Sequence, residues 1–138
     1  IGRLDRLTLE LQESISESIK LTRNNTGMIL NVAFDYGGRD EILEAVRRII
    51  ADHHTPEEIT EDLFREYLDT GNLPDPDLII RTAGEMRISN FLLWQSAYAE
   101  YYTTPILWPN FDEAEVAKAL DVYASRLRRF GRIMEPAS

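Results

Sequence analysis

Cysteine is absent from the sequence, and that absence excludes several kinds of site at once. Without thiols the chain has no disulfide framework, no thiolate metal centre and no cysteine nucleophile, and its composition fits a reducing compartment. Long apolar runs are also missing: no stretch approaches the roughly 20 residues that a bilayer-spanning helix needs. No signal-peptide pattern is evident either. We therefore expect a cytoplasmic protein.

Positive charge is scarce, because 15 Lys and Arg are outnumbered by 24 Asp and Glu, which gives a formal net charge of -9. Phosphate backbones are held chiefly by dense Lys and Arg, so this charge argues against a nucleic-acid partner. A small anionic substrate stays compatible with the composition if a few arginines gather at one place.

The length of 138 residues suits one domain, and a hydrophobic content of 43% is enough to form a core. The sequence opens with Ile1-Gly2-Arg3 and has no initiator methionine. We expect a piece that was processed or excised from a longer chain.

Helix signals alternate with short apolar runs in the first part of the sequence. Apolar residues recur every four positions between residues 4 and 23, which predicts a helix. Residues 28–34, MILNVAF, form an apolar run between turn signals and predict a buried parallel strand. The turn at residues 36–38, YGG, is expected to lead into a second helix.

A helix start is clearest in residues 55–58, TPEE. Thr55 provides an N-cap, proline takes the first helical position, and Glu58 closes a capping box. The helix that begins there is expected to break near Thr60 and to stop at Gly71.

The second half continues the alternation of short strands with helices. Strands are predicted at residues 77–81 and 100–103, and helices at 90–98 and 112–129. This pattern predicts an α/β fold with a partial, mainly parallel sheet covered by helices. Because parallel sheets need both faces covered, we expect further strands outside this sequence.

A group of polar residues follows the strand at residues 77–81. Ligands bind beyond the carboxyl ends of parallel strands, and Arg81 is the last residue of that strand. Arg87 and Ser89 follow within the next loop, where Ser89 is placed to cap the next predicted helix. Two guanidinium groups and a helix N-terminus would bind a phosphate or diphosphate through charge-assisted hydrogen bonds. The alternative is that the two arginines form structural ion pairs with Glu85 and Asp77.

Residues 77–111 read DLIIRTAGEMRISNFLLWQSAYAEYYTTPILWPNF, and this segment closely resembles the signature region of cis-prenyltransferases of the undecaprenyl diphosphate synthase type. The turns NNTG and YGGR and the final RRFG also match, so the resemblance covers essentially the whole chain. It implies that residues 1–138 are the C-terminal half of a single cis-prenyltransferase domain whose N-terminal half is absent. Three positions depart from the family pattern: Asp35 stands where Asn is usual, Ala83 where Ser or Gly is common, and Asn110 where Asp is usual.

The resemblance implies a transferase of isoprenoid biosynthesis that joins isopentenyl diphosphate to an allylic diphosphate with cis geometry and makes a polyprenyl diphosphate. Carried over by position, Arg81, Arg87 and Ser89 bind the head group of isopentenyl diphosphate. Glu100 matches the acidic residue that helps to hold the cofactor Mg²⁺, a cation that commonly bridges carboxylate and phosphate. Apart from the resemblance, Glu100 reads as a solvated or edge-strand residue.

The basic end of the sequence also has two interpretations. Arginines around the last helical turn complement the helix dipole, and Gly131 fits a C-cap. In the family, an Arg-x-Gly near the C-terminus reaches the active site of the partner subunit. Arg129 and Gly131 occupy those positions, which implies substrate contact and a homodimer with shared sites, or a heterodimer with a related chain.

The family's DGNGRWA loop, which carries the aspartate expected to act in catalysis, has no equivalent here. The resemblance therefore implies that this chain supplies the isopentenyl diphosphate site and cannot elongate a prenyl chain alone. An alternative is a non-catalytic partner subunit of a heterodimer. An accessory subunit needs no complete head-group site, which argues against this alternative because the chain retains Arg81, Glu85, Arg87, Ser89 and Glu100. The extended match likewise argues against a generic phosphate-binding module.

Overall fold

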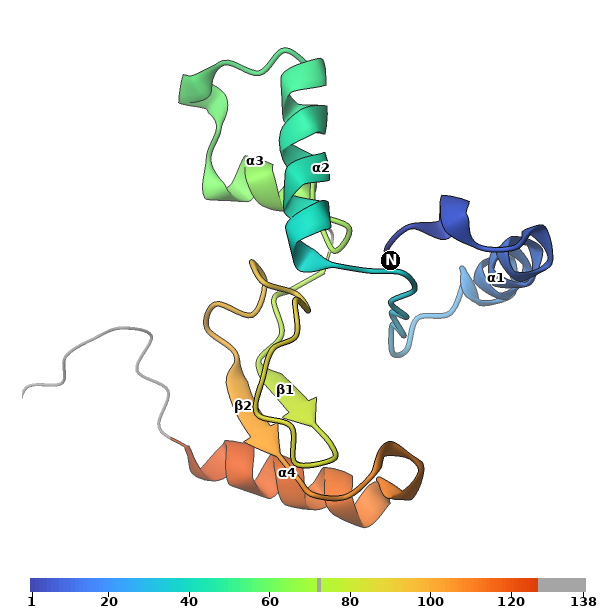
Figure 1. The fold of residues 1–138 in the computed structure, drawn as a ribbon, viewed down its shortest axis with the longest axis vertical. Helices are drawn as coiled ribbons and strands as arrows, with labels where there is room; N and C mark the ends of the chain where they lie inside the picture. Colours follow the sequence, from blue (N-terminus) through green and yellow to red (C-terminus); the bar gives the residue numbers. More distant parts are fainter. Residues whose placement is uncertain (72, 127–138) are drawn as a thin grey trace, which may run out of the picture. The chain divides into compact units, whose positions relative to one another are not determined.

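The computed structural model describes residues 1–71 and 73–126. The chain divides into two compact units, Ile1–Pro74 and Asp75–Ser138, which we describe separately. Figure 1 gives the labels of the helices and strands. In the described part of the chain, no helix combines the length and apolar character needed to cross a membrane.

The regular elements in the described residues of the first unit are all helices. They are the 3₁₀ helix η1 (Leu4–Arg6), α1 (Leu9–Thr22), α2 (Gly38–Ala51), the 3₁₀ helix η2 (Pro56–Glu58) and α3 (Glu61–Glu66). The helix predicted between residues 4 and 23 is thus divided, because Thr8 caps α1 by accepting a hydrogen bond from the Leu11 amide at 3.4 Å. The second helix begins at Gly38, as predicted from the YGG turn.

The core of the first unit lies between α2 and α3. Its buried side chains are Ala45, Ile49, Phe64 and Leu68, with Ile42 and Tyr67 packed against them. A charged side chain is buried beside this core: Glu41 accepts hydrogen bonds from the Tyr36 hydroxyl at 2.5 Å and from the Asp69 amide at 2.9 Å. These hydrogen bonds compensate the desolvation of the Glu41 carboxylate. They also connect the YGG turn before α2 to Asp69, which follows α3.

The capping box at residues 55–58 is present, and so is the predicted break near Thr60. The Thr55 amide donates to Glu58 Oε2 at 2.8 Å, and this hydrogen bond is the main cause that lowers the pKa of Glu58. Thr60 then caps α3 by accepting from the Leu63 amide at 3.1 Å. Two caps in close succession explain why the segment forms two short helices rather than one.

The strand predicted at residues 28–34 is wrong for this structure, since the segment forms no regular element. Within the described residues, its backbone hydrogen bonds reach only the start of the chain: the Ile1 amino group donates to the Val32 carbonyl and the Phe34 amide donates to the Ile1 carbonyl. Met28 and Leu30 are 89% and 79% exposed. An apolar run becomes a strand only beside another strand, so its composition alone does not determine its conformation.

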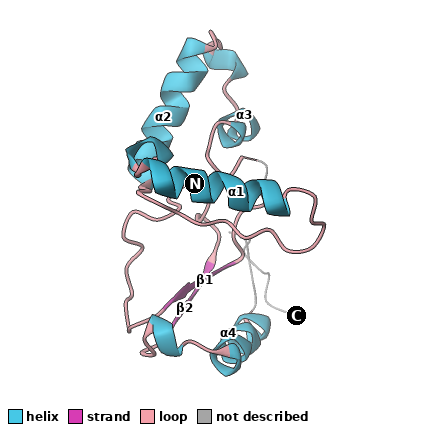
Figure 2. Cartoon of the chain, turned by 90° about the vertical axis from the view of Figure 1, so that its right-hand side faces the viewer, coloured by secondary structure: helices cyan, strands magenta, loops and turns pink. Residues whose placement is uncertain are grey.

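The second unit contains a parallel strand pair and a covering helix (Figure 2). Its elements are β1 (Leu78–Arg81), β2 (Glu100–Thr103), the 3₁₀ helix η3 (Trp108–Asn110) and α4 (Glu113–Ser125). Leu78 lies opposite Glu100, and Arg81 lies opposite Thr103. Both predicted strands are confirmed, and α4 packs against β2, so the α/β class with a partial parallel sheet is confirmed as well.

The helix predicted at residues 90–98 is also wrong, because that segment is a series of turns. Ser89, Asn90 and Leu92 have φ angles of 51°, 62° and 45°. Left-handed residues so close together cannot belong to a right-handed helix, and Ser89 therefore caps none. The last helix starts as predicted, with Asp112 accepting from the Glu115 amide at 3.1 Å, while the predicted end near residue 129 lies outside the described residues.

Candidate functional site: an arginine-lined pocket

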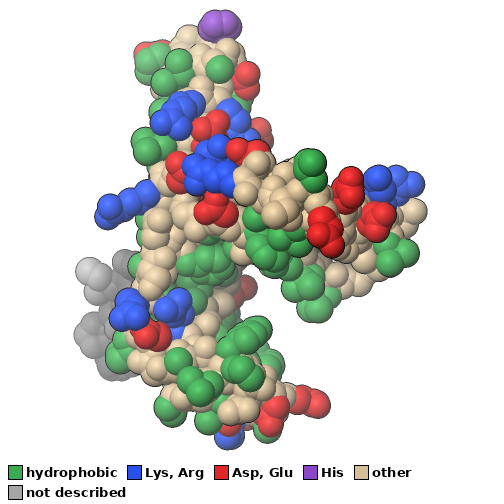
Figure 3. Space-filling view, turned by 45° about the vertical axis from the view of Figure 1, so that its right-hand side comes forward, with side chains coloured by type: hydrophobic (Ala, Val, Ile, Leu, Met, Phe, Trp, Pro, Cys, Tyr) green, Lys and Arg blue, Asp and Glu red, His purple; other side chains and the backbone are tan. Residues whose placement is uncertain are grey.

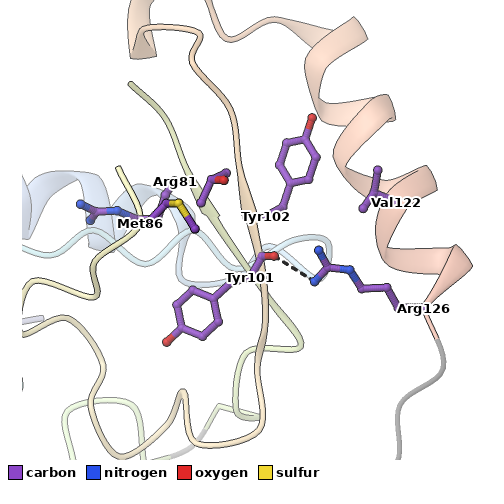
Figure 4. A pocket seen from close by; sticks show the side chains of 7 residues that line it. Arg81, Met86, Tyr101, Tyr102, Val122 and Arg126 are labelled. Atoms are coloured by element: carbon purple, nitrogen blue, oxygen red, sulfur yellow. Dashed lines mark hydrogen bonds between the residues drawn. The ribbon is translucent and has the colours of Figure 1, made fainter. Parts of the chain in front are cut away.

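The second unit has an open pocket of about 430 Å³ beside the strand pair (Figure 4). Its lining combines cationic, hydroxyl-bearing and apolar side chains: Arg81, Met86, Tyr101, Tyr102, Thr103, Val122 and Arg126. Tyr101 and Tyr102 leave β2 on opposite sides, while Val122 comes from α4 (Figure 4). The pocket can therefore contact both an anion and an apolar group.

Arg81 is the residue that links the pocket to the sequence prediction. It ends β1 opposite Thr103, so both residues lie at the carboxyl end of the parallel pair, where ligands bind in such sheets. Its guanidinium group forms no hydrogen bond or ion pair with another described residue. The alternative of an ion pair with Glu85 or Asp77 thus does not hold for Arg81 within residues 1–71 and 73–126, and its charge remains available to an anion.

Arg87 and Ser89 lie near this pocket in sequence but do not line it. The Arg87 side chain is 72% exposed and forms an ion pair with Glu85, with Nη2 at 2.7 Å from Oε2. The structural ion pair considered from the sequence is therefore present for Arg87. Ser89 is exposed and belongs to the left-handed turn. The structure places Arg81 in the pocket without bringing Arg87 or Ser89 into its lining.

The loop that carries these residues is fixed at its start to the segment after β2. The Ala83 amide donates to the Ile106 carbonyl and the Gly84 amide to the Thr104 carbonyl, both at 2.8 Å. Ala83 and Gly84 have φ angles of 58° and 68°, which turn the chain sharply after Arg81. This turn holds Met86 at the pocket.

Glu100 is the first residue of β2 and lies at the other end of the strand pair from Arg81. Three residues of strand separate it from Thr103, which is roughly 10 Å at about 3.3 Å per residue. Its Oε2 atom accepts a hydrogen bond from Arg126 Nη1 at 2.8 Å. The same Nη1 atom donates to the Tyr101 carbonyl at 2.9 Å, as Figure 4 shows by a dashed line.

The side chains near Glu100 decide whether this position can hold a magnesium ion. Among the described residues, no group of three or more His, Asp or Glu side chains could hold a metal. Mg²⁺ is often bound through one or two carboxylates, with phosphate oxygens and waters completing its shell. The single carboxylate of Glu100 fits that kind of site, in which the ion would replace the Arg126 guanidinium. Arg129 and Gly131 lie outside the described residues.

Of the lining residues, the sequence singled out Arg81 alone, and Arg126 is the second charged residue among them. It directly follows α4 as the C-cap residue, a position where the helix dipole is a sufficient explanation for an arginine. No local spacing relates it to Glu100, which lies 26 positions earlier in the sequence. Only the packing of α4 on β2 brings the two side chains together.

A parallel strand pair, a covering helix and a pocket lined by two arginines define the class of this protein as α/β. The family described as putative undecaprenyl diphosphate synthase matches residues 1–131, and the chain belongs to this family. This confirms the family identified from residues 77–111.

Curated relatives carry the same assignment. The isoprenyl transferase of Streptococcus pyogenes serotype M3 is 52% identical over 141 residues, which cover 96% of this chain and 57% of that protein. The isoprenyl transferase of Fusobacterium nucleatum is 53% identical over 132 residues, with 96% of this chain and 56% of that protein covered. The chain thus spans somewhat more than half the length of these relatives.

Solved structures agree in fold. Lavandulyl diphosphate synthase from Lavandula x intermedia, in complex with dimethylallyl diphosphate, has a TM-score of 0.93 and 45% identity and covers 96% of this chain and 58% of its own. A probable undecaprenyl diphosphate synthase from Campylobacter jejuni has a TM-score of 0.84 and 35% identity, with 96% and 61% covered. The identities are high enough for the likeness to be one of family as well as fold.

Proposed function

We propose that this chain forms the isopentenyl diphosphate site of a cis-prenyltransferase, an enzyme that condenses isopentenyl diphosphate with an allylic diphosphate. The observation that carries the proposal is the guanidinium group of Arg81, which lines a pocket at the carboxyl end of β1 and has no partner among the described residues. A cation without a protein counter-ion in a concave site favours an anionic ligand.

The remaining lining fits the other end of such a substrate. Met86 and Val122 are apolar, and the tyrosine rings of β2 add apolar surface with polar tips. Isopentenyl diphosphate joins a multiply charged anionic head to a short branched hydrocarbon, so a pocket with both kinds of surface fits it better than a purely polar one. Binding both ends would position the alkene for attack on the allylic carbon.

Arg87 and Ser89 complete the proposed head-group site from the adjacent loop. Arg87 is exposed and held by Glu85, so it would bind phosphate by exchanging that carboxylate. Bidentate contacts from Arg81 and Arg87 would neutralise the charge that the diphosphate brings. Arg129 and Gly131 are proposed to reach the site of a second subunit in a homodimer.

Glu100 is proposed to hold Mg²⁺, which when bound would neutralise diphosphate charge as a Lewis acid. Two features support Glu100 as a ligand of the ion: it offers a carboxylate donor, and the next residue, Tyr101, lines the pocket. We also infer a cytoplasmic location from the composition. Because the chain spans 57% of the relative from Streptococcus pyogenes, we propose that the 138 residues bind substrate but do not elongate a prenyl chain alone.

The test combines binding and turnover. Isopentenyl diphosphate is titrated calorimetrically into the wild-type chain, Arg81→Gln and the control Arg47→Gln, whose exposed arginine pairs with Glu44 in the first unit. Loss of a charge-assisted contact predicts binding at least about 10-fold weaker for Arg81→Gln and unchanged for Arg47→Gln. Equal affinities for the two variants would refute the site.

The turnover arm uses Mg²⁺, farnesyl diphosphate and labelled isopentenyl diphosphate. Prenyl product above background would show that the 138 residues suffice and would overturn the proposed dependence on further sequence. Stimulation of a separate cis-prenyltransferase by a chain that binds no substrate itself would favour the partner-subunit role instead.

A further inference from the structure

The pocket contains a second guanidinium group in addition to that of Arg81. Arg126 follows the last turn of α4 and lines the same pocket, with its side chain directed at β2 (Figure 4). Arg81 is the last residue of β1 and precedes β2 in the sequence. Arg126 comes after β2 and directly follows α4. The pocket thus has two guanidinium groups, although Arg87 of the signature segment does not line it.

Arg126 is only partly committed to its protein partners. Its Nη1 atom makes both of its side-chain hydrogen bonds to described residues, one to Glu100 Oε2 and one to the Tyr101 carbonyl. An arginine offers five N–H donors. Its Nε and Nη2 groups therefore keep donors for a ligand, and the side chain is 35% exposed.

The position of Arg126 is set by the backbone on both sides of the pocket. The Arg126 amide donates to the Tyr123 carbonyl at 3.1 Å, which closes the end of α4, and α4 packs on β2. The bond to the Tyr101 carbonyl then holds the guanidinium over β2. Because that carbonyl belongs to the backbone, it can keep Arg126 at the pocket when Glu100 is released.

We propose that Arg126 is a second anion-binding residue of the pocket and that Glu100 is the internal counter-ion that occupies it until a diphosphate arrives. This inference rests on the proposed function, since it takes the diphosphate group as the ligand. A half-exposed ion pair between single charges is weak. A diphosphate brings several oxygens and more than one negative charge, so it can compete with the single carboxylate of Glu100 for the Arg126 guanidinium.

The experiment measures binding of inorganic diphosphate in metal-free buffer by calorimetry to the 138-residue chain. The variants are Arg126→Gln, Arg126→Lys, Arg81→Gln, Glu100→Gln, the double variant Glu100→Gln/Arg126→Gln, and the control Arg47→Gln. Circular dichroism verifies that each variant is folded. Arg126→Lys retains the charge without the fork of donors, so it stays informative if Arg126→Gln disturbs the end of α4.

Arg126→Gln is expected to weaken diphosphate binding about 10-fold, and Arg126→Lys less, because a charge-assisted contact is lost or shortened. Glu100→Gln is expected to tighten binding about 3-fold, because it removes the competing carboxylate. That gain should disappear in the double variant. If Glu100→Gln still tightens diphosphate binding when Arg126 is replaced as well, Glu100 acts on the ligand through its charge alone. That result would overturn the proposed exchange of Glu100 for diphosphate at Arg126.

The result for Arg81→Gln separates this inference from the proposed function. If binding depends on Arg81 and is unaffected by Arg126→Gln, the proposed function stands and the role of Arg126 is refuted. If the wild-type chain binds neither inorganic diphosphate nor isopentenyl diphosphate, both are refuted.

Discussion

At the scale of single residues, backbone conformation explains two departures from the family pattern. Ala83 has a φ of 58° and Asp35 a φ of 45°, a left-handed region that glycine and asparagine adopt more readily than other residues. The family usually has Ser or Gly where this chain has Ala83, and Asn where it has Asp35. Glycine and asparagine are the two of these residue types that adopt the left-handed region with less strain. Asp35 has a compensating contact, an ion pair with Arg6 at 3.2 Å.

Ala83→Gly is therefore expected to stabilise the chain. Glycine removes the strain of the left-handed conformation in the folded state but increases the conformational entropy of the unfolded chain. The first contribution is expected to be larger, which predicts a gain of about 0.5 kcal/mol in the free energy of unfolding. Urea denaturation measures it, with Ala83→Val as the opposite control because a β-branched side chain is still less favoured there. A loss of stability in Ala83→Gly would show that the left-handed turn is not required.

A second residue-scale prediction concerns acid pH. Arg3 donates to both carboxylate oxygens of Asp5, at 2.9 and 2.8 Å, and this hydrogen-bonded pair lowers the pKa of Asp5 to about 2. Because the folded-state pKa lies below the ordinary value of 3.8, the pair stabilises the fold above pH 3.8, and that contribution is lost as the pH falls towards 2.

Carbon-detected NMR should thus find the Asp5 carboxyl titrating near pH 2. In Arg3→Gln the midpoint should return towards 3.8. Since both side chains face solvent, high salt should reduce the difference between the two proteins. A wild-type midpoint already at the ordinary value would rule out the pair in solution.

At the scale of elements, caps decide where the short helices begin. The α3 helix spans six residues, Glu61–Glu66, too few to form by propensity alone. Thr60→Ala removes the acceptor for the Leu63 amide and is expected to lower the free energy of unfolding by about 1 kcal/mol. Thr60→Ser keeps a hydroxyl and should lose much less. Urea denaturation compares the two, and equal losses would mean that the cap does not contribute.

At the scale of the whole molecule, much apolar surface is exposed (Figure 3). Met28, Ile29 and Leu30 are 89%, 72% and 79% exposed in succession. A contiguous apolar segment of this kind promotes dye binding and self-association. The charge of -9 opposes association at neutral pH without covering the segment.

The double substitution Met28→Gln/Leu30→Gln should reduce both effects without unfolding the chain. Because these side chains bury little area, the free energy of unfolding should change by less than about 0.5 kcal/mol. Fluorescence of a hydrophobic dye and light scattering measure the surface effect. Ile49→Gln, in the core of the first unit, is the control expected to unfold the protein. A large loss of stability in the double variant would mean that the segment is buried in solution.

Local signals were sufficient for much of the fold. Several predicted features depend on neighbours close in sequence. They are the cap at Thr55, the break near Thr60, the helix after the YGG turn and the strands predicted at residues 77–81 and 100–103. The charge and the absence of cysteine limited the class of protein, and the ordered matches in residues 77–111 identified the family. These features need no knowledge of packing, because each is contained in a short segment.

Other features depend on contacts between distant segments. Residues 28–34 have the composition of a buried strand, yet they form one only if a second strand lies beside them. Turns with positive φ replace a helix after Ser89, although the composition there favours helix. The pair of Arg126 with Glu100 joins residues 26 positions apart. Hydrogen bonds and ion pairs across such separations arise from how the elements pack, which no local pattern of residues encodes.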